Sequence, residues 1–326
     1  MASQANIKLG ISLYSYTNEY YERRLSFEDC LRSTQQLGAT GIEIVASQMI
    51  EGYPWPTAKT IARYRELFAQ YGLEPVAYGA SVDRGLRSDR DLTGSELLAG
   101  LTDDIRNAAL LGCSIVRTQF LLSPDVLERA QEAAAAYKVK VGIELHNPST
   151  PRSPEIAEYT RMFQRVKSPW IGFVLDFGTY QERPDKFARD SFLEKGVRPE
   201  VFDLITEGIE KALPKEEVAA RLNTMQPIGP EFGALEFCYT RYKPSNLDEL
   251  REILPYINHC HGKFYYVDEH YSDPAIAYGP VISLLKEGGF EGYIMSEYEG
   301  HMFGDRGDVV ELLRRHLTME RKMLGL

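Results

Sequence analysis

The stretch Val139–Asn147, VKVGIELHN, indicates the fold, because its run of apolar residues ends in side chains that bind metal ions. The run closes at Glu144, and His146 follows two residues later. Three later stretches end in the same way: IGFVLDFG at 171–178, INHCHGKF at 257–264 and GYIMSEYEGH at 292–301. Short apolar runs bounded by Gly or Pro are typical of buried parallel strands. In barrel enzymes, the carboxyl ends of such strands carry the catalytic residues.

The composition bounds the class of protein. The chain has 326 residues, 44% of them hydrophobic, and a net charge of −10, which suits one large barrel or two ordinary domains. A long basic patch is absent, so nucleic-acid binding is disfavoured. We expect no membrane partner, since no apolar run approaches the roughly 20 residues of a spanning helix and the N-terminus lacks a signal core. Four scattered cysteines without a CxxC pair suggest buried thiols in a reducing cytoplasm.

Strand and helix candidates alternate along the whole chain, in units of the size of a βα pair. Ser26, with Asp29 three residues later, predicts a capped helix start, as do Thr57, Ser123-Pro124 and Ser153-Pro154. The expected strands are 7–13, 41–46, 74–79, 114–119, the stretch that begins at 139, 171–176, 258–265 and 292–297. The expected later helices are 245–254, 279–287 and 308–324.

A long insertion, residues 177–244, interrupts this repeat after the sixth strand. It is charged and aromatic, with helical pieces near 198–212 and 215–225 and a segment rich in glycine and aromatic residues at 229–242. An insertion at the carboxyl end of a strand lies on the catalytic face, where it forms a lid, a substrate wall or a partner surface. We therefore predict an α/β protein: one (β/α)8 TIM-barrel domain over residues 1–326. A doubly wound sheet would have fewer strands and a glycine-rich phosphate turn, which is missing.

Three of the strand ends carry the carboxylates Glu144, Asp176 and Glu297. Facing one barrel mouth, they would repel one another and raise one another's pKa unless a cation lay between them. His261 is the best candidate for an imidazole ligand. A set of three carboxylates and one imidazole favours Mn²⁺ or Mg²⁺, and the imidazole also allows Zn²⁺, Co²⁺ or Fe²⁺.

The seventh strand places His259, His261 and Lys263 on one face, since side chains two residues apart point to the same side. We interpret His259 as a packed core residue. Lys263 either neutralises an oxyanion or pairs with an acid. His146 shares the face of Glu144, and it is either the general base or a hydrogen-bond partner of a substrate hydroxyl.

Further candidates surround this expected site. Arg117 and Gln119 end the fourth strand, where they bind substrate oxygens or Arg117 pairs with Glu144. Glu299 and His301 follow the last strand and are candidates for substrate contact. Three aromatic side chains of the early loops suit a sugar or a flat aglycone, although ordinary loop packing is the favoured explanation for any one of them: Tyr14, Tyr16 and Trp55.

A metal bound in this way can hold two neighbouring sugar oxygens and stabilise the enediolate left when the adjacent carbon loses a proton. The outcome is isomerisation, epimerisation or elimination. A hydrolytic nuclease is the competing class, but barrel nucleases use a histidine-rich zinc site, whereas this acidic chain has six histidines.

The strand-end motifs GIELHN, LDFG, HCHGKF and SEYEGH resemble those of the sugar phosphate isomerase/epimerase superfamily, the xylose isomerase-like barrels. A closer resemblance, to the catalytic α subunits of bacterial C-glycoside deglycosidases, rests on the order of GISLYSYTNEY, GASVDRG, LLSPDVLE, VKVGIELHNP and GGFEGYIMSEYEGH. The superfamily resemblance implies metal ligation by Glu144, Asp176, His261 and Glu297.

The closer resemblance also implies the reaction. The substrate would be a 3-oxo-glycoside made by a separate oxidoreductase, and a metal, typically Mn²⁺, would hold the C2 hydroxyl and the C3 carbonyl. His146 would remove the C2 proton, and the enolate would expel the aglycone from C1 by β-elimination. A small β subunit would complete a heteromer, with the insertion as the place for that contact or for aglycone recognition. The alternatives are an isomerase or 3-epimerase of free ketoses, and a non-catalytic subunit that keeps the metal site.

Overall fold

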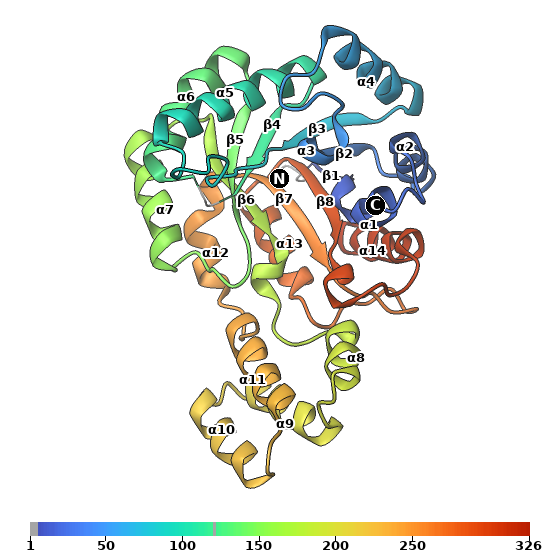
Figure 1. The fold of residues 1–326 in the computed structure, drawn as a ribbon, viewed down its shortest axis with the longest axis vertical. Helices are drawn as coiled ribbons and strands as arrows, with labels where there is room; N and C mark the ends of the chain where they lie inside the picture. The colour runs from blue at the N-terminus through green and yellow to red at the C-terminus, as the bar shows by residue number, and fades with distance from the viewer. Residues whose placement is uncertain (1–5, 120–121) are drawn as a thin grey trace.

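The computed structural model describes residues 6–119 and 122–326, and these form a closed barrel of eight parallel strands in the order β1 to β8 (Figure 1). The predicted (β/α)8 barrel is therefore confirmed. The strands are β1 Ile7–Ser12, β2 Gly41–Val45, β3 Glu74–Gly79, β4 Ile115–Thr118, β5 Lys140–Leu145, β6 Ile171–Asp176, β7 Ile257–Phe264 and β8 Gly292–Tyr298. β3 and β6 have the predicted bounds, and the others differ from them by one or two residues at an end.

The helices surround the barrel and begin largely where the sequence predicts. Ser26 and Asp29 form the expected capping box, and the Thr57 and Ser123 side chains accept from the first turns of their helices. The helices of the first half are α1 Thr17–Tyr21, α2 Phe27–Gln36, α3 Ala46–Met49, α4 Ala58–Tyr71, α5 Gly94–Leu111, α6 Pro124–Tyr137 and α7 Pro154–Val166. Those after the insertion are α12 Leu247–Ile253, α13 Tyr278–Glu287 and α14 Val309–Leu324. Short 3-10 turns follow the ends of β1, β6 and β8.

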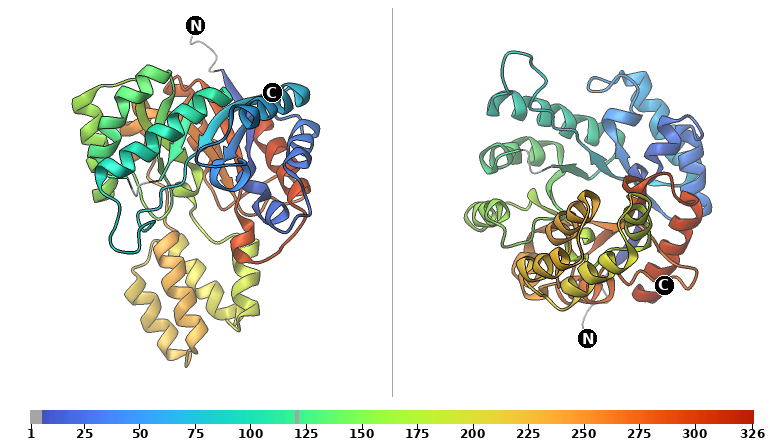
Figure 2. Two further views of the ribbon diagram at one scale, coloured as in Figure 1. Left: turned by 45° about the horizontal axis from the view of Figure 1, so that its top comes forward. Right: turned by 60° about the horizontal axis from the view of Figure 1, so that its bottom comes forward.

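The insertion contains four α-helices: α8 Lys186–Glu194, α9 Pro199–Glu210, α10 Lys215–Thr224 and α11 Gly229–Arg241. It projects from the barrel and packs around its own hydrophobic cluster, which includes Phe202, Ile205 and Leu235 (Figures 1 and 2). The glycine-rich segment 229–242, to which the sequence assigned no structure, is mostly α11. Its first turn is held by the fully buried Glu231, which accepts from the backbone of Ile228 and pairs with Arg198.

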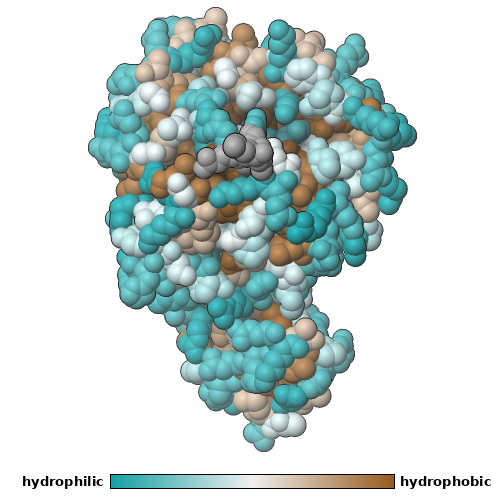
Figure 3. All heavy atoms as spheres, turned by 180° about the vertical axis from the view of Figure 1, so that it is seen from behind, coloured by the Kyte–Doolittle hydropathy of each residue, from teal (hydrophilic) through white to brown (hydrophobic). Residues whose placement is uncertain are grey.

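Apolar side chains are gathered inside the barrel and between barrel and helices, while the face in Figure 3 is largely hydrophilic. All four cysteines are buried and unpaired with one another, as expected. Within residues 6–119 and 122–326, each helix is too short or too polar to cross a membrane. The carboxyl ends of the strands thus meet the insertion at the mouth of the barrel, where the expected site residues lie.

Candidate metal centre

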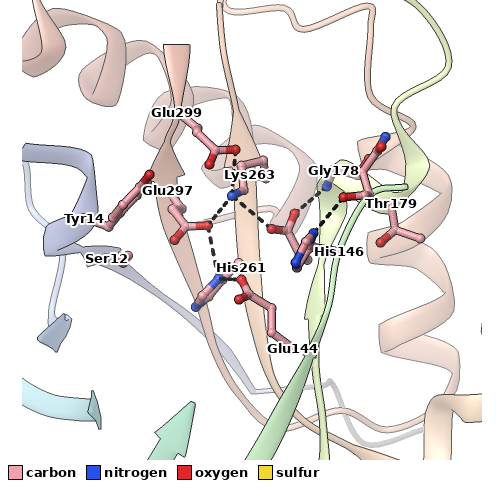
Figure 4. A network of polar contacts seen from close by, with 12 residues as sticks. Ser12, Tyr14, Glu144, His146, Gly178, Thr179, His261, Lys263, Glu297 and Glu299 are labelled. Atoms are coloured by element: carbon pink, nitrogen blue, oxygen red, sulfur yellow. Dashed lines mark hydrogen bonds and ion pairs between the residues drawn. The ribbon is translucent and has the colours of Figure 1, made fainter. Parts of the chain in front are cut away.

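Four buried side chains from four strands converge at the barrel mouth, and one ligand atom of each lies within 4.8 Å of the others (Figure 4). They are the expected Glu144, Asp176, His261 and Glu297, from β5, β6, β7 and β8. His261 Nδ1 lies 3.0 Å from Glu144 Oε1 and 3.1 Å from Glu297 Oε2. Asp176 Oδ1 accepts from the backbone N–H of Gly178 at 2.6 Å, which orients that carboxylate.

The charges around this cluster favour ionised carboxylates. Burial raises the pKa of Glu144, but the Arg117 and His261 charges outweigh it and lower the value to about 2. Burial likewise opposes the ionisation of Glu297, yet the charges on His261 and Lys263 lower its pKa. For Asp176 burial prevails over the Lys263 charge and raises the pKa to about 6. Because three converging carboxylates and one imidazole nitrogen are ligands that divalent cations use, the donor set fits a metal ion.

Lys263 also lies inside this group. Its Nζ is 2.8 Å from Glu297 Oε2, 3.1 Å from Asp176 Oδ2 and 3.1 Å from Glu299 Oε2. The sequence left two roles open for Lys263, and the one seen in this structure is pairing with acids. The ammonium partly neutralises two of the expected ligands, so a bound cation and Lys263 share the same carboxylates.

Glu43, in the middle of β2, is a part of the site that the sequence analysis missed. Its side chain is fully buried, and Oε2 lies 2.8 Å from His261 Nε2 and 3.3 Å from His259 Nε2. The other oxygen, Oε1, accepts from Arg117 at 3.4 Å. An acid with apolar neighbours on both sides, as in GIEIV, was the available signal. Glu43 lies inside a strand, whereas the pattern used for the other ligands applies to strand ends.

The Glu43 contact fixes which nitrogen of His261 faces the expected metal. Since a carboxylate only accepts, both ring nitrogens carry a hydrogen in this structure: Nε2 donates to Glu43, and Nδ1 faces the Glu144 and Glu297 oxygens. A metal ion held by the cluster would replace the hydrogen on Nδ1. A carboxylate behind a ligand histidine is a recurrent arrangement in metal sites. His259 is fully buried beside the same carboxylate, and burial lowers its pKa.

A cavity of about 270 Å³ opens beside the cluster. The expected His146, Arg117, Gln119, Tyr14 and Glu299 all line it, together with Lys263. The His146 ring donates from Nδ1 to the backbone carbonyl of Asn147 at 2.7 Å, because a carbonyl oxygen only accepts.

The remaining aromatic candidates and His301 lie elsewhere. His301 contacts the Tyr14 hydroxyl at 3.3 Å from behind the cavity wall. Tyr16 is fully buried and donates to Ser33, so it belongs to the core. Trp55 is 70% exposed, donates to Asp103 and does not line the cavity. Tyr14 is thus the one of the three early aromatic residues that reaches the cavity.

Two contributors from other segments were not expected. Arg241, the last residue of α11, lines the cavity and donates to the Tyr265 hydroxyl at 2.9 Å. Asn147 donates through Nδ2 to the carbonyls of Arg241, at 2.6 Å, and Gly178, at 3.1 Å. The insertion is therefore fastened to the ends of β5 and β6, beside His146. No spacing in the sequence relates Arg241 to Asn147, so only folding reveals this contact.

Comparison with known proteins places the chain in a family. The sequence model of the xylose isomerase-like TIM barrel matches residues 31–318. The chain belongs to that family. Its solved relatives include a D-psicose 3-epimerase (14% identity, TM-score 0.60, covering 98% of this chain and 100% of that one). A 3-keto-D-glucoside 4-epimerase from E. coli matches at 13% identity with a TM-score of 0.56, covering 97% and 100% of the two chains.

Closer relatives are found by sequence. The C-glycoside deglycosidase alpha subunit of Arthrobacter globiformis is 30% identical over 98% of this chain and 93% of its own length. The 3'-dehydrocarminate deglycosidase alpha subunit of a Microbacterium species is 29% identical over 100% of this chain and 97% of its own. The resemblance to deglycosidase α subunits that the motifs indicated is thereby confirmed.

Proposed function

We propose that this chain is the catalytic subunit of a metal-dependent C-glycoside deglycosidase, a lyase that acts on 3-oxo-glycosides. The observation that supports this most is the convergence of Glu144, Asp176, His261 and Glu297 beside a cavity that His146 also lines. The names of the full-length relatives supply the substrate class and the heteromer. Mn²⁺ is the favoured metal, since the donor set is rich in carboxylate oxygen.

The four converging residues would hold the metal, whose positive charge, when bound, favours negative charge on two neighbouring sugar oxygens. His146 Nε2 takes the proton from C2, which is acidic because it adjoins the C3 carbonyl. The electron pair of that C–H bond forms the enolate and then the C1–C2 double bond, while the bond from C1 to the aglycone breaks. The aglycone leaves with the electron pair of the broken C1–aglycone bond and takes up a proton. Arg117 and Lys263, each paired with carboxylates, are placed to bind substrate oxygens.

The test is aglycone release from a 3-oxo-C-glucoside by the protein co-expressed with its β subunit and supplied with Mn²⁺. His146→Ala is expected to lower the rate by about 10²- to 10⁴-fold, the usual contribution of a general base, while bound Mn²⁺ is retained. His270→Ala is the matched control, because His270 is exposed and does not line the cavity. An unchanged rate in the His146 variant would refute the role of base.

The same preparations separate the competing functions. Interconversion of free ketoses without aglycone release would assign the protein to the isomerases and epimerases, to which the solved relatives above belong by name. Bound Mn²⁺ without either activity, in the presence of the β subunit, would indicate a non-catalytic subunit. We also propose that the complex works in the cytoplasm.

A further inference from the structure

Three basic side chains line the cavity within the described part of the chain, and Arg241 differs from the other two. Arg117 lies 3.4 Å from Glu43 and 3.8 Å from Glu144, and Lys263 pairs with three carboxylates. Among the described residues, Arg241 has no carboxylate within 4.0 Å. The guanidinium makes one hydrogen bond to these residues, and it goes to the neutral Tyr265 hydroxyl at 2.9 Å. The insertion therefore presents to the cavity a guanidinium that forms no ion pair with the residues the structure describes.

The surroundings of Arg241 are aromatic. Its guanidinium carbon lies 5.3 Å from the centre of the Phe237 ring and 6.0 Å from that of Tyr265. Tyr265 and the partly exposed Met302 complete this wall of the cavity. A planar cation beside ring faces and a thioether suits a flat ligand that carries a negative charge at its edge, because a guanidinium binds a carboxylate through two parallel hydrogen bonds.

Arg241 is also held in place at the reacting end of the cavity. Its backbone carbonyl accepts from Asn147 Nδ2 at 2.6 Å, one residue beyond His146. On its other side, the Tyr265 hydroxyl donates to Glu299 Oε2 at 3.3 Å, and the same oxygen is 3.1 Å from Lys263 Nζ. Arg241 is thus connected to the proposed base through Asn147, and to the carboxylate cluster through Tyr265, Glu299 and Lys263.

We infer that Arg241 is a specificity-determining residue that binds an acidic aromatic aglycone, one with a carboxylate or phenolate on the ring, and that the insertion is the aglycone wall. The inference rests on the proposed function, because it takes the ligand to be the aglycone that leaves in that reaction. Where the aglycone leaves as a phenolate, its ring oxygen gains the negative charge as the bond to C1 breaks, so the same contact assists departure of the aglycone.

The binding experiment uses two probes of the same shape, 2,4-dihydroxybenzoate and its methyl ester, titrated by calorimetry into the Mn²⁺-loaded complex. The native protein is expected to bind the acid about 10- to 100-fold more tightly than the ester, the range for a buried charge-assisted hydrogen bond. Arg241→Met keeps an unbranched apolar side chain but removes the charge, so it should bind both probes alike. Arg241→Lys should retain a reduced preference.

Arg221→Met is the matched control, because Arg221 lies on the insertion, is 53% exposed and pairs with Glu217 outside the cavity. Melting temperatures of all variants check the fold, and the lysine variant provides the test if the methionine variant unfolds. An unchanged preference for the acid in Arg241→Met would overturn the inference. So would tighter binding of glucose 6-phosphate than of 2,4-dihydroxybenzoate, since the anion would then belong to a sugar phosphate.

The kinetic arm compares 3-oxo-C-glucosides of the same acid and ester aglycones. Arg241→Met should lower kcat/KM for the acid about 10- to 100-fold more than for the ester. This outcome is distinguishable from failure of the proposed function. If no glycoside is cleaved, the acid-over-ester preference in binding and its loss in Arg241→Met still decide the ligand class.

Discussion

The strongest test of the metal centre changes Glu43, which contacts the expected imidazole ligand rather than the metal itself. Glu43 is fully buried, and its Oε2 accepts from His261 Nε2 at 2.8 Å. A hydrogen bond to a charged group contributes about 1.5–3 kcal/mol, roughly twice the value for a neutral one. Glu43→Gln keeps the shape and a neutral acceptor, so it should lose about half of that contribution. Because 1.4 kcal/mol is tenfold in affinity, Mn²⁺ should bind up to about tenfold more weakly.

Glu43→Ala should have a larger effect, about 100-fold, because it removes the partner of His261 altogether. Affinity is measured by competition for Mn²⁺ with a fluorescent chelator, and ¹⁵N chemical shifts of the His261 ring report which nitrogen carries the hydrogen. In the metal-free native protein we expect a hydrogen on both ring nitrogens, because each faces a carboxylate. In Glu43→Ala, Nε2 loses its acceptor, so the ring should give up its charge at a lower pH.

Glu320→Gln is the matched control for Glu43→Gln. Glu320 is also fully buried and accepts from Ser296, but burial raises its pKa far above the usual range, so its neutral form is nearly isosteric with glutamine. Mn²⁺ affinity should be unchanged in this variant. If Glu43→Gln bound Mn²⁺ as tightly as the native protein, the proposed orientation of His261 by Glu43 would be refuted.

Three other perturbations probe ligand binding and stability. Mn²⁺ at 100 times its Kd should stabilise the fold by about 2.7 kcal/mol, so a chelator should lower the melting temperature, and no difference would contradict a metal site. Burial raises the pKa of Asp104 to about 7, above its unfolded value, so the fold favours the neutral form. The free energy of unfolding should therefore fall as pH rises from about 4 to 7. Asp104→Asn should flatten this part of the stability-against-pH curve, and a curve parallel to that of the native protein would contradict the burial argument. Gly262→Ala would bring a Cβ to within 2.5 Å of Glu320 Oε1, so urea titration should show a loss of about 1–3 kcal/mol. Gly233→Ala, with nothing within 4 Å on an exposed helix face, should instead gain roughly 0.5–1 kcal/mol, and equal signs for the two variants would refute the packing argument.

The sequence by itself determined the barrel and the positions of its strand ends. Strands such as Ile171–Asp176 can be recognised in the sequence, because a strand buried on both faces must be apolar almost throughout. A charged residue marks its end. The helix starts at Ser26 and Thr57 are local as well, since the cap contacts a residue three positions away. Local rules of this kind also brought Glu144 and His261 into the expected ligand set, because all parallel strands end on one face of a barrel.

The tertiary structure decided which side chains meet. Glu43 lies 218 residues from His261 in the chain, and Arg241 lies 94 residues from Asn147, so no periodicity relates either pair. The same is true of the helix at 229–241, whose glycines argue against a helix locally, while Glu231 stabilises its first turn by pairing with Arg198. Hydrogen bonds and charge pairs between distant segments depend on closure of the whole barrel. Only the fold therefore reveals the contact of Glu43 with the expected ligand His261 and the place of Arg241 in the cavity wall.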